Sequence, residues 1–463
     1  MDHITAYKKL EQYEQKTNVW DLKTKDEIYL WPLIKFKIFR LLNNSSTKVQ
    51  KDAFIQAVKN TLYSSLNILR SYYALKKVKN FKHLYFSFPD TRKLHPNGYV
   101  DIIFDPLLTG SDQAILEWPV PVNHKKNVYT KSSNYIPIDF IYFKNQILAF
   151  VLSFFTPDYL YINDNIGGVS YEKINKILKR RIIEYRLYRK DFLDLFSHSS
   201  ISSVSFKSSY FPPHQALISA AKKSNILSTE MQHGIISEYH PGYIYTTRPS
   251  NSSTTFPDQI KVFGKNTQKL LHSSEVYKKT CQIKPYPYLE NIKTLYSQIS
   301  PQETREKLNI SPHEKVILFS SQWVNRTYSL TFLKELANQL PSHYIILIKP
   351  HPIEENPQEF YRDLLKNYNT RISDQSVAIY ELFNIATIHT SIYSTSVMES
   401  LVWGIPNILI ETPDSENIKA LKDSNAIQFV VNQESYIDAL NNIASNESHY
   451  QSSSYTLSKE YYN

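Results

Sequence analysis

The sequence predicts an α/β protein with two doubly wound parallel sheets that follow a helical N-terminal segment. Three observations lead to this prediction. Short apolar runs alternate with helical stretches from Lys82 onward, and the 463 residues exceed the size at which one hydrophobic core usually keeps growing. The alternation also stops between Cys281 and Pro312, a stretch that carries Pro285, Pro287, Pro301 and Pro312. We therefore place a domain boundary there.

The first half of the chain is expected to contain a helical segment and one sheet. Residues 1–78 are rich in Lys, Leu and Tyr and form the helical segment, and residues 79–285 form the first sheet domain. Apolar runs predict strands near 82–88, 99–108, 114–118, 136–143, 202–210, 226–234 and 259–264. Helical periodicity predicts helices at 171–196 and 214–223, and another that begins at Lys265.

The second half repeats the same alternation in residues 300–445. Buried-strand patterns at 315–323, 343–349, 385–391, 405–411 and 426–431 predict a sheet of five or six strands. Helices are expected at 330–340, 359–368, 377–384, 396–403 and 435–444. The polar tail is expected to end in a loose helix.

Charge and cysteine content limit the classes of function. The chain has 53 basic and 43 acidic residues, a formal charge of +10, which favours polyanionic partners such as nucleic acid, an anionic membrane face or phosphorylated substrates. The excess is spread along the chain, so it singles out none of them. One cysteine, Cys281, excludes an internal disulfide and fits a reducing compartment. With no secretory signal pattern and no long apolar run, we expect a cytoplasmic protein.

Two segments have the composition of membrane-surface helices. Residues 28–42 mix Trp, Phe and Leu with Lys35, Lys37 and Arg40, and residues 143–155 are strongly apolar. The favoured interpretation of both is a helix packed into the N-terminal core. The alternative is peripheral contact with the inner face of an anionic cell membrane.

The second sheet domain carries polar residues directly after a strand. Lys349, His351 and Pro352 follow the run YIILIK, at the carboxyl end where open α/β sheets bind ligands. An imidazole there can donate to a phosphate oxygen, and the proline stiffens the turn. With only 8 glycines, the chain has no dinucleotide fingerprint and no Walker A loop, so a phosphate site must use hydroxyls and backbone amides.

A group of hydroxyl residues lies in the next strand-to-helix connection. Ser391, Ser394, Thr395 and Ser396 occupy the gap before a predicted helix, where hydroxyls and free amides can bind an anion. The alternative is structural, because Ser396 and Glu399 have the spacing of a capping box. Glu399 could instead bind the two hydroxyls of a ribose.

In the first sheet domain, candidate acid or base residues also follow strands. Glu230 and His233 end the run ILSTEMQH, and a histidine's ordinary pKa suits a general base. Asp101 and Asp105, with Asp90, are alternative bases or turn residues. The acidic and histidine residues are too scattered to predict a metal site.

These motifs resemble those of glycosyltransferases of the GT-B type, in which two Rossmann-like domains face a cleft. The resemblance covers about residues 200–445 and rests on EMQHG, HPGY, KPHP and the segment STSVMESLVWGIP that ends at Pro406. The motifs are similar to those of bacterial capsule and lipopolysaccharide enzymes, including the sialyltransferases and Kdo transferases that use CMP-sugars.

The resemblance implies a metal-independent transfer that needs no cofactor. His351 and the hydroxyls of Ser394 to Ser396 would contact the donor phosphate, with Glu399 on the ribose, and the base would be His233, Glu230 or Asp101 in that order. A CMP-sugar is the favoured donor and a UDP-sugar the next. The acceptor would be a surface glycan or lipid-linked glycan.

Other functions remain open from the sequence. Transferases of CDP-glycerol or CDP-ribitol use the same scaffold and similar loops, whereas nucleotide-sugar 2-epimerases usually have a more glycine-rich donor loop. The basic helix at residues 176–190 also fits a non-enzymatic polyanion-binding protein, although no nucleic-acid-binding fold accompanies it.

Overall fold

The computed structural model describes most of the chain, and its contacts divide the chain into two compact units. The described residues are 3–43, 65–88, 91–95, 98–119, 134–197, 199–234, 236–245, 256–274, 277, 281–322, 325–351, 354–412, 421 and 424–462. The first unit comprises Met1–Arg92, Asp101–Val262 and Asn266–Pro285, and the second comprises Lys93–Val100, Phe263–Lys265 and Tyr286–Asn463. Each is described by itself.

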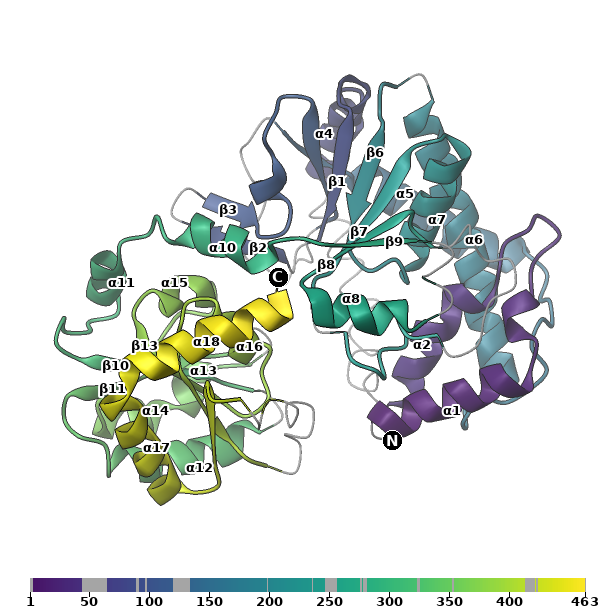
Figure 1. The fold of residues 1–463 in the computed structure, drawn as a ribbon. Helices are drawn as coiled ribbons and strands as arrows, with labels where there is room; N and C mark the ends of the chain where they lie inside the picture. The colour runs from purple at the N-terminus through teal and green to yellow at the C-terminus, as the bar shows by residue number, and fades with distance from the viewer. Residues whose placement is uncertain are drawn as a thin grey trace. The chain divides into compact units, whose positions relative to one another are not determined.

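A parallel sheet of seven strands forms the centre of the first unit (Figure 1). Its order is β5-β4-β1-β6-β7-β8-β9, so the strands run outward in both directions from β1 and β6. This is the doubly wound arrangement, and its topological switch point lies between β1 and β6. The strands are β1 (His83–Ser87), β4 (Gln113–Glu117), β5 (Tyr135–Pro137), β6 (Ser203–Phe206), β7 (Leu227–Met231), β8 (Gln259–Val262) and β9 (Gln282–Pro285).

Helices flank this sheet, and most of them share a hydrophobic core with it, whereas Leu271 of α8 belongs to a separate cluster with β8. In the longest of them, buried residues recur at helical spacing from Ile174 to Phe196, and the Ser170 side chain caps its first turn. The helices of this half are α1 (His3–Lys16), α2 (Trp31–Leu42), α4 (Ser65–Leu75), α5 (Asp139–Phe155), α6 (Tyr171–Phe196), α7 (Pro212–Lys223) and α8 (Lys265–His272), with short 3₁₀ turns η1 (Val19–Asp21), η2 (Val78–Asn80) and η4 (Asp105–Leu107).

The second unit has a parallel sheet of six strands with the order β12-β11-β10-β13-β14-β15. This order also matches a doubly wound sheet, with its switch point between β10 and β13. Every residue of β11 is buried, as expected for a strand covered on both faces. The strands are β10 (Lys315–Ser320), β11 (Tyr344–Lys349), β12 (Thr370–Ile372), β13 (Ala386–Ser391), β14 (Asn407–Ile410) and β15 (Ile427–Val430).

Nine described helices accompany this second sheet and its own hydrophobic core. Directly after the short helix α16, Gly404 has φ +73°, and a side chain there would collide with the Tyr455 ring of the C-terminal helix. The helices are α10 (Tyr288–Tyr296), α11 (Pro301–Lys307), α12 (Arg326–Ala337), α13 (Pro357–Phe360), α14 (Arg362–Asn367), α15 (Ile379–Phe383), α16 (Ser396–Leu401), α17 (Gln433–Ser445) and α18 (Glu447–Tyr462).

The expected fold class is confirmed, and three local expectations are wrong. Residues 99–108 do not form a strand of the main sheet: β3 (Gly98–Asp101) pairs with β2 (Arg92–His95) in a separate two-stranded sheet. Residues after Pro137 start helix α5 instead of continuing a strand. β9 lies within the stretch that was expected to lack strands.

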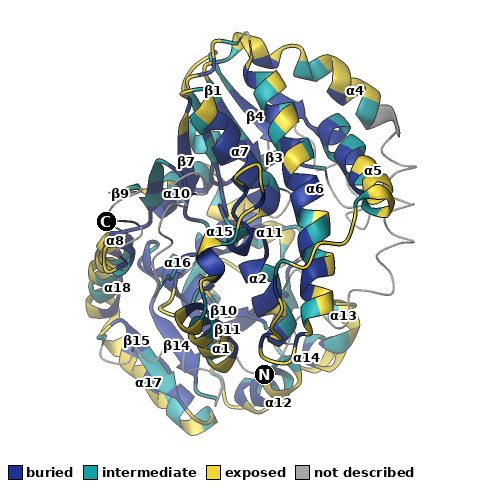
Figure 2. Cartoon of the chain, turned by 90° about the vertical axis from the view of Figure 1, so that its right-hand side faces the viewer, coloured by how far each residue is buried: buried dark blue, intermediate teal, exposed yellow. Residues whose placement is uncertain are grey.

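The two apolar segments differ in burial. α2 packs Trp31, Ile34 and Ile38 into the core, so the core interpretation holds for it. α5 buries its first half, but many of its later apolar side chains are exposed (Figure 2). In the described part of the chain, no helix is both long and apolar enough to cross a membrane.

Candidate functional site

Polar side chains collect at the switch point of the second sheet. Ser320 ends β10 and Ser391 ends β13, and these neighbouring parallel strands bring their carboxyl ends to the same edge. The loop after β13 then leads through Ser394 to α16. Ligands of open α/β sheets bind outside the carboxyl ends of the strands at this point.

His389 is the centre of this cluster, and no pattern in the sequence singled it out. Its Nδ1 lies 2.6 Å from Asn407 Oδ1, and its Nε2 lies 2.7 Å from Ser320 Oγ and 3.2 Å from Ser396 Oγ. Because an amide oxygen only accepts, Nδ1 carries the proton and Nε2 accepts from a serine hydroxyl. Burial lowers the pKa of His389 to about 4, so the ring is neutral near pH 7.

Ser394 is the hydroxyl of this cluster that can serve a ligand. Its Oγ accepts from the Ser396 hydroxyl at 2.7 Å and from the Ser396 amide at 3.3 Å. Both contacts use Ser394 as an acceptor, which leaves its own proton to donate. Ser394 is half-buried whereas Ser396 is buried, and the Ser396 hydroxyl and amide fix the position of the Ser394 oxygen.

Two expectations for this loop are corrected. Ser391 has no exposed surface and donates to the Ser320 carbonyl at 3.0 Å, so it joins the two strands instead of facing a ligand. The capping box is also absent, because Thr395 is the N-cap of α16 and makes no side-chain cap bond, and Ser396 bonds elsewhere. α16 is only six residues long, so the hydroxyls, rather than a helix dipole, are the stronger feature.

Glu399 is half-buried and lies in α16. Burial raises its pKa to about 7, against the opposing effects of nearby Lys93 and a hydrogen bond from Tyr380. Because the expected capping box does not form, the Glu399 carboxyl is not held by the helix start, and it can exchange a proton near neutral pH.

The residues after β11 are placed differently from expectation. The Lys349 Nζ donates to the carbonyls of Asp374 at 3.2 Å and Gln375 at 3.0 Å, and burial lowers its pKa to about 8. It therefore fixes a loop and is removed from the phosphate-binding candidates. His351 is half-buried, and its backbone amide donates to Glu354 Oε1 at 2.9 Å. Pro352 lies outside the described residues.

In the first unit, His233 follows β7 and meets the loop that follows β6. Its Nε2 lies 3.1 Å from Ser208 Oγ, and the ring is half-buried. Ser208 has φ 60°, a left-handed conformation that is uncommon for serine and that occurs frequently at functional sites. The Ser208 carbonyl also accepts from Nδ1 of buried His214 at 3.1 Å. The Ser208 hydroxyl therefore helps to fix the orientation of the His233 ring.

Glu230, the second candidate base, is fully buried. Its Oε1 accepts from the Ser209 amide at 3.0 Å and the Tyr243 hydroxyl at 2.6 Å. Burial raises its pKa. Glu230 connects the ends of β6 and β7, so its role is to position the loop that carries Ser208.

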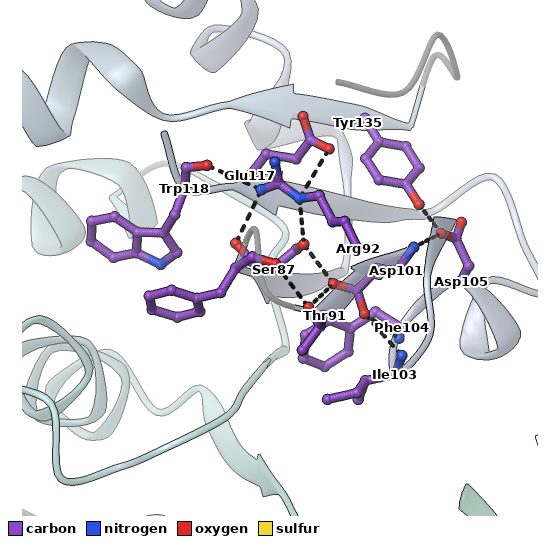
Figure 3. A network of polar contacts seen from close by, with 11 residues as sticks. Ser87, Thr91, Arg92, Asp101, Ile103, Phe104, Asp105, Glu117, Trp118 and Tyr135 are labelled. Atoms are coloured by element: carbon purple, nitrogen blue, oxygen red, sulfur yellow. Dashed lines mark hydrogen bonds and ion pairs between the residues drawn. The ribbon is translucent and has the colours of Figure 1, made fainter. Parts of the chain in front are cut away.

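Asp101, the third candidate base, is corrected to a structural residue (Figure 3). Its side chain is fully buried and accepts four hydrogen bonds, from Ser87 Oγ, Thr91 Oγ1 and the amides of Ile103 and Phe104. The two amide bonds make a turn, which explains why residues 102–108 leave the strand. Buried Arg92 bonds Ser87 Oγ at 3.0 Å and lies 3.5 Å from Glu117, which completes the network.

The described residues offer no group of three or more His, Cys, Asp or Glu side chains that could hold a metal ion. The site residues that sequence reasoning missed are Ser320, His389 and Ser208. Ser320 and Ser321 directly follow the apolar run KVILF, which is the same strand-end signal that pointed to Lys349.

No protein-family model and no curated protein sequence matches the chain. Among solved structures, it resembles a putative UDP-N-acetylglucosamine 2-epimerase from Listeria monocytogenes, with a TM-score of 0.51 and 10% identity over 83% of this chain and 92% of that one. A second UDP-N-acetylglucosamine 2-epimerase gives a TM-score of 0.50 and 10% identity over 82% and 92% of the two chains. The wall teichoic acid polymerase TagF gives a TM-score of 0.48 and 13% identity over 90% of this chain and 93% of that one.

The chain has a GT-B-type fold. The two epimerases support this statement, since their likeness extends over both units, and an identity near 10% supports the fold alone. The TagF likeness is too weak to support more.

Proposed function

We propose that this protein is a metal-independent glycosyltransferase that moves a sugar from a nucleotide-sugar to a surface-glycan acceptor, of the kind made in capsule or lipopolysaccharide synthesis. The observation that carries the proposal is the cluster of Ser394, Ser396, His389 and Ser320 at the switch point of the second sheet. A preorganised hydroxyl at that position suits a phosphate oxygen, which accepts hydrogen bonds only.

The second unit would bind the donor. Ser394 donates its hydroxyl proton to the diphosphate or monophosphate oxygen on which negative charge develops as the sugar departs. The Ser396 hydroxyl and amide hold the Ser394 oxygen in place before the reaction, which lowers the cost of ordering it in the transition state. Half-buried His351 is a second donor candidate, and Glu399 in its ionised form would accept from the ribose hydroxyls.

The first unit would supply the base. His233 takes the proton of the acceptor hydroxyl as that oxygen attacks the anomeric carbon, and Ser208 fixes the ring. The placement of Glu230 and Asp101 in buried networks supports His233 over both alternatives.

The donor nucleotide is proposed from the loop chemistry. CMP remains favoured through the resemblance to sialyltransferases and Kdo transferases, and the epimerases of the same fold, whose names specify UDP-N-acetylglucosamine, support UDP as the next candidate. Transfer of a polyol phosphate from CDP-glycerol is the alternative reaction.

A binding experiment tests the donor site. We expect one of CMP, UDP, GDP or CDP to raise the melting temperature of the full chain, because a ligand that binds only the folded state stabilises it. Ser394→Ala should lower the affinity for that nucleotide by about 10-fold to 100-fold, since a hydrogen bond to a charged group contributes about 1.5–3 kcal/mol.

Ser452→Ala is the matched control, because Ser452 is an exposed serine of the same unit, in α18. The proposal fails if no nucleotide shifts the melting temperature, or if both serine variants bind equally well. Turnover of CDP-glycerol in place of a nucleotide-sugar would establish the alternative.

We also propose that the acceptor is lipid-linked and that the protein works at the cytoplasmic face of the membrane. The exposed apolar residues of α5 support this location.

A further inference from the structure

The first unit contains a cavity of about 800 Å³ that the donor and base sites do not use. Its lining includes Phe88 directly after β1, Trp118 directly after β4, and Pro212 at the start of α7. The cavity thus lies beside the switch point between β1 and β6, the position where a doubly wound sheet binds ligands. Residues of α2, α5 and α6 complete its lining.

The lining is strongly cationic. Glu184 is the one carboxylate among the described lining residues, and it is already paired with Arg180 at 3.0 Å and Arg181 at 2.5 Å. The remaining cations of the lining are three lysines, from α2 and α6: Lys37, Lys173 and Lys176. Burial and the nearby charges of Arg40, Arg181 and Lys173 lower the pKa of Lys37. An anion in the cavity would relieve this repulsion.

Aromatic side chains also line the cavity, and one of them carries a buried donor. The rings of Phe88 and Trp118 stack with centroids 5.4 Å apart. Trp118 is 4% exposed, and its indole Nε1 has no acceptor within hydrogen-bond distance in the described part of the chain. A buried N–H without an acceptor is unfavourable.

An exposed apolar stripe begins next to this cavity. Gln146 of α5 lines the cavity and accepts from Arg180 Nη2 at 3.2 Å. The next residue, Ile147, starts a stripe at helical spacing with Phe150, Val151, Phe154 and Phe155, whose exposed fractions range from 42% to 79% (Figure 2). Large apolar side chains exposed together on one helix mark an interaction surface.

We propose that the cavity binds the phosphate headgroup of an anionic membrane lipid while the stripe of α5 rests in the apolar layer of the same membrane. Charge complementarity selects this occupant: a free phosphate would use the lysines and leave the stripe uncovered, whereas a membrane lipid satisfies both. Membrane binding would bring the enzyme to a lipid-linked acceptor, and only this biological role rests on the proposed function.

Flotation of the full chain with lipid vesicles tests the proposal. We expect binding to phosphatidylglycerol vesicles, little binding to phosphatidylcholine vesicles, and loss of binding as salt is raised. Phe150→Ser with Phe154→Ser should reduce binding at least 10-fold, and so should Lys173→Glu with Lys176→Glu. All four residues are exposed, so these variants should fold.

Two controls match these variants. Val431→Ser removes an exposed apolar residue and Lys284→Glu reverses an exposed charge, both outside the cavity and the stripe, and both should bind vesicles normally. The nucleotide-induced melting shift should be unchanged in every variant, so a failure of membrane binding is distinguishable from a failure of the donor site.

Three results would overturn the proposal. The first is equal binding to both kinds of vesicle, or to neither. The second is normal vesicle binding by the phenylalanine variant together with full competition by inorganic phosphate, which would identify a free phosphate as the ligand. The third is a dimer of the wild-type chain in sedimentation that the phenylalanine variant loses, which would make a second copy the occupant of the stripe.

Discussion

At the scale of single residues, burial controls the charge of the candidate site. It holds His389 neutral near pH 7 and brings the pKa of Glu399 to about 7, although one is a base and the other an acid. The physical cause is the same for both, because a buried side chain disfavours its charged form. The cluster that holds Ser394 therefore contains a neutral histidine, and the helix α16 that follows Ser394 carries a carboxyl whose charge depends on pH.

Replacing Glu399 with Gln should stabilise the protein at alkaline pH. The folded-state pKa of about 7 lies above the ordinary value of 4.5, so this carboxyl favours folding below pH 4.5 and that contribution is lost as the pH rises through 7. The variant should gain about 1–2 kcal/mol in the free energy of unfolding at pH 8 and little at pH 5. The value at pH 8 is reduced because the side chain is partly exposed.

Urea denaturation at both pH values measures this difference. Glu460→Gln is the control, because Glu460 is exposed in α18. An equal gain at pH 5 and pH 8 would contradict the assigned protonation of Glu399.

At the scale of elements, β13 depends on a histidine in its interior. His389 joins β13 to Ser320 of β10 and to Asn407 of β14, so one ring connects three neighbouring strands. The same ring lies within reach of Ser396 in α16. The position of the loop that carries Ser394 therefore depends on a residue inside the sheet.

Acid should destabilise this element. The unfolded chain takes up the His389 proton near pH 6.5 and the folded protein only near pH 4, so stability falls as the pH drops through that window. The full difference corresponds to about 3 kcal/mol. His389→Gln should make the free energy of unfolding depend less steeply on pH between 6.5 and 4, whatever its effect at pH 7.

The exposed residue His313 provides the comparison, since His313→Gln should leave the pH dependence unchanged. Identical slopes for wild type and His389→Gln would show that His389 is not held neutral by the fold.

The sequence predicted the positions of strands and helices better than it predicted the hydrogen bonds between their side chains. Buried runs such as YIILIK and the spacing of apolar residues in 171–196 were sufficient for β11 and α6. The run YVDIIFDPLL failed because Asp101 bonds the amides of Ile103 and Phe104, and such a side-chain turn leaves the apolar pattern unchanged.

The same limit applies to the candidate site. Strand-end position pointed to Ser394 and His233, and the structure places both residues after the carboxyl ends of strands. Strand-end position could not show that the Lys349 ammonium donates hydrogen bonds to two carbonyls. It also could not show that His389 bonds Asn407, which is 18 residues away. Spacing likewise predicted a cap for Ser396, whose hydroxyl bonds Ser394 instead.

At the scale of the whole molecule, the proposed donor site and the proposed base lie in different units. His233→Ala should therefore retain nucleotide affinity within about 2-fold and lose sugar transfer by about 10²-fold to 10⁴-fold, the range expected for a general base. Nucleotide titration and turnover of the same preparation measure the two effects.

His272→Ala is the control for that variant, since His272 is an exposed histidine of the same unit at the end of α8. A His233→Ala protein with normal turnover would remove His233 from the mechanism. A loss of nucleotide affinity would contradict the division of roles between the units.

Amide hydrogen exchange of the full chain, with and without the nucleotide that shifts its melting temperature, tests the donor site most directly. We expect slower exchange in residues 320–322 and 391–401, around Ser320 and Ser394, and no change in residues 207–213 after β6. Slower exchange elsewhere in the second unit, with residues 391–401 unaffected, would contradict the assignment of the switch point as the nucleotide site.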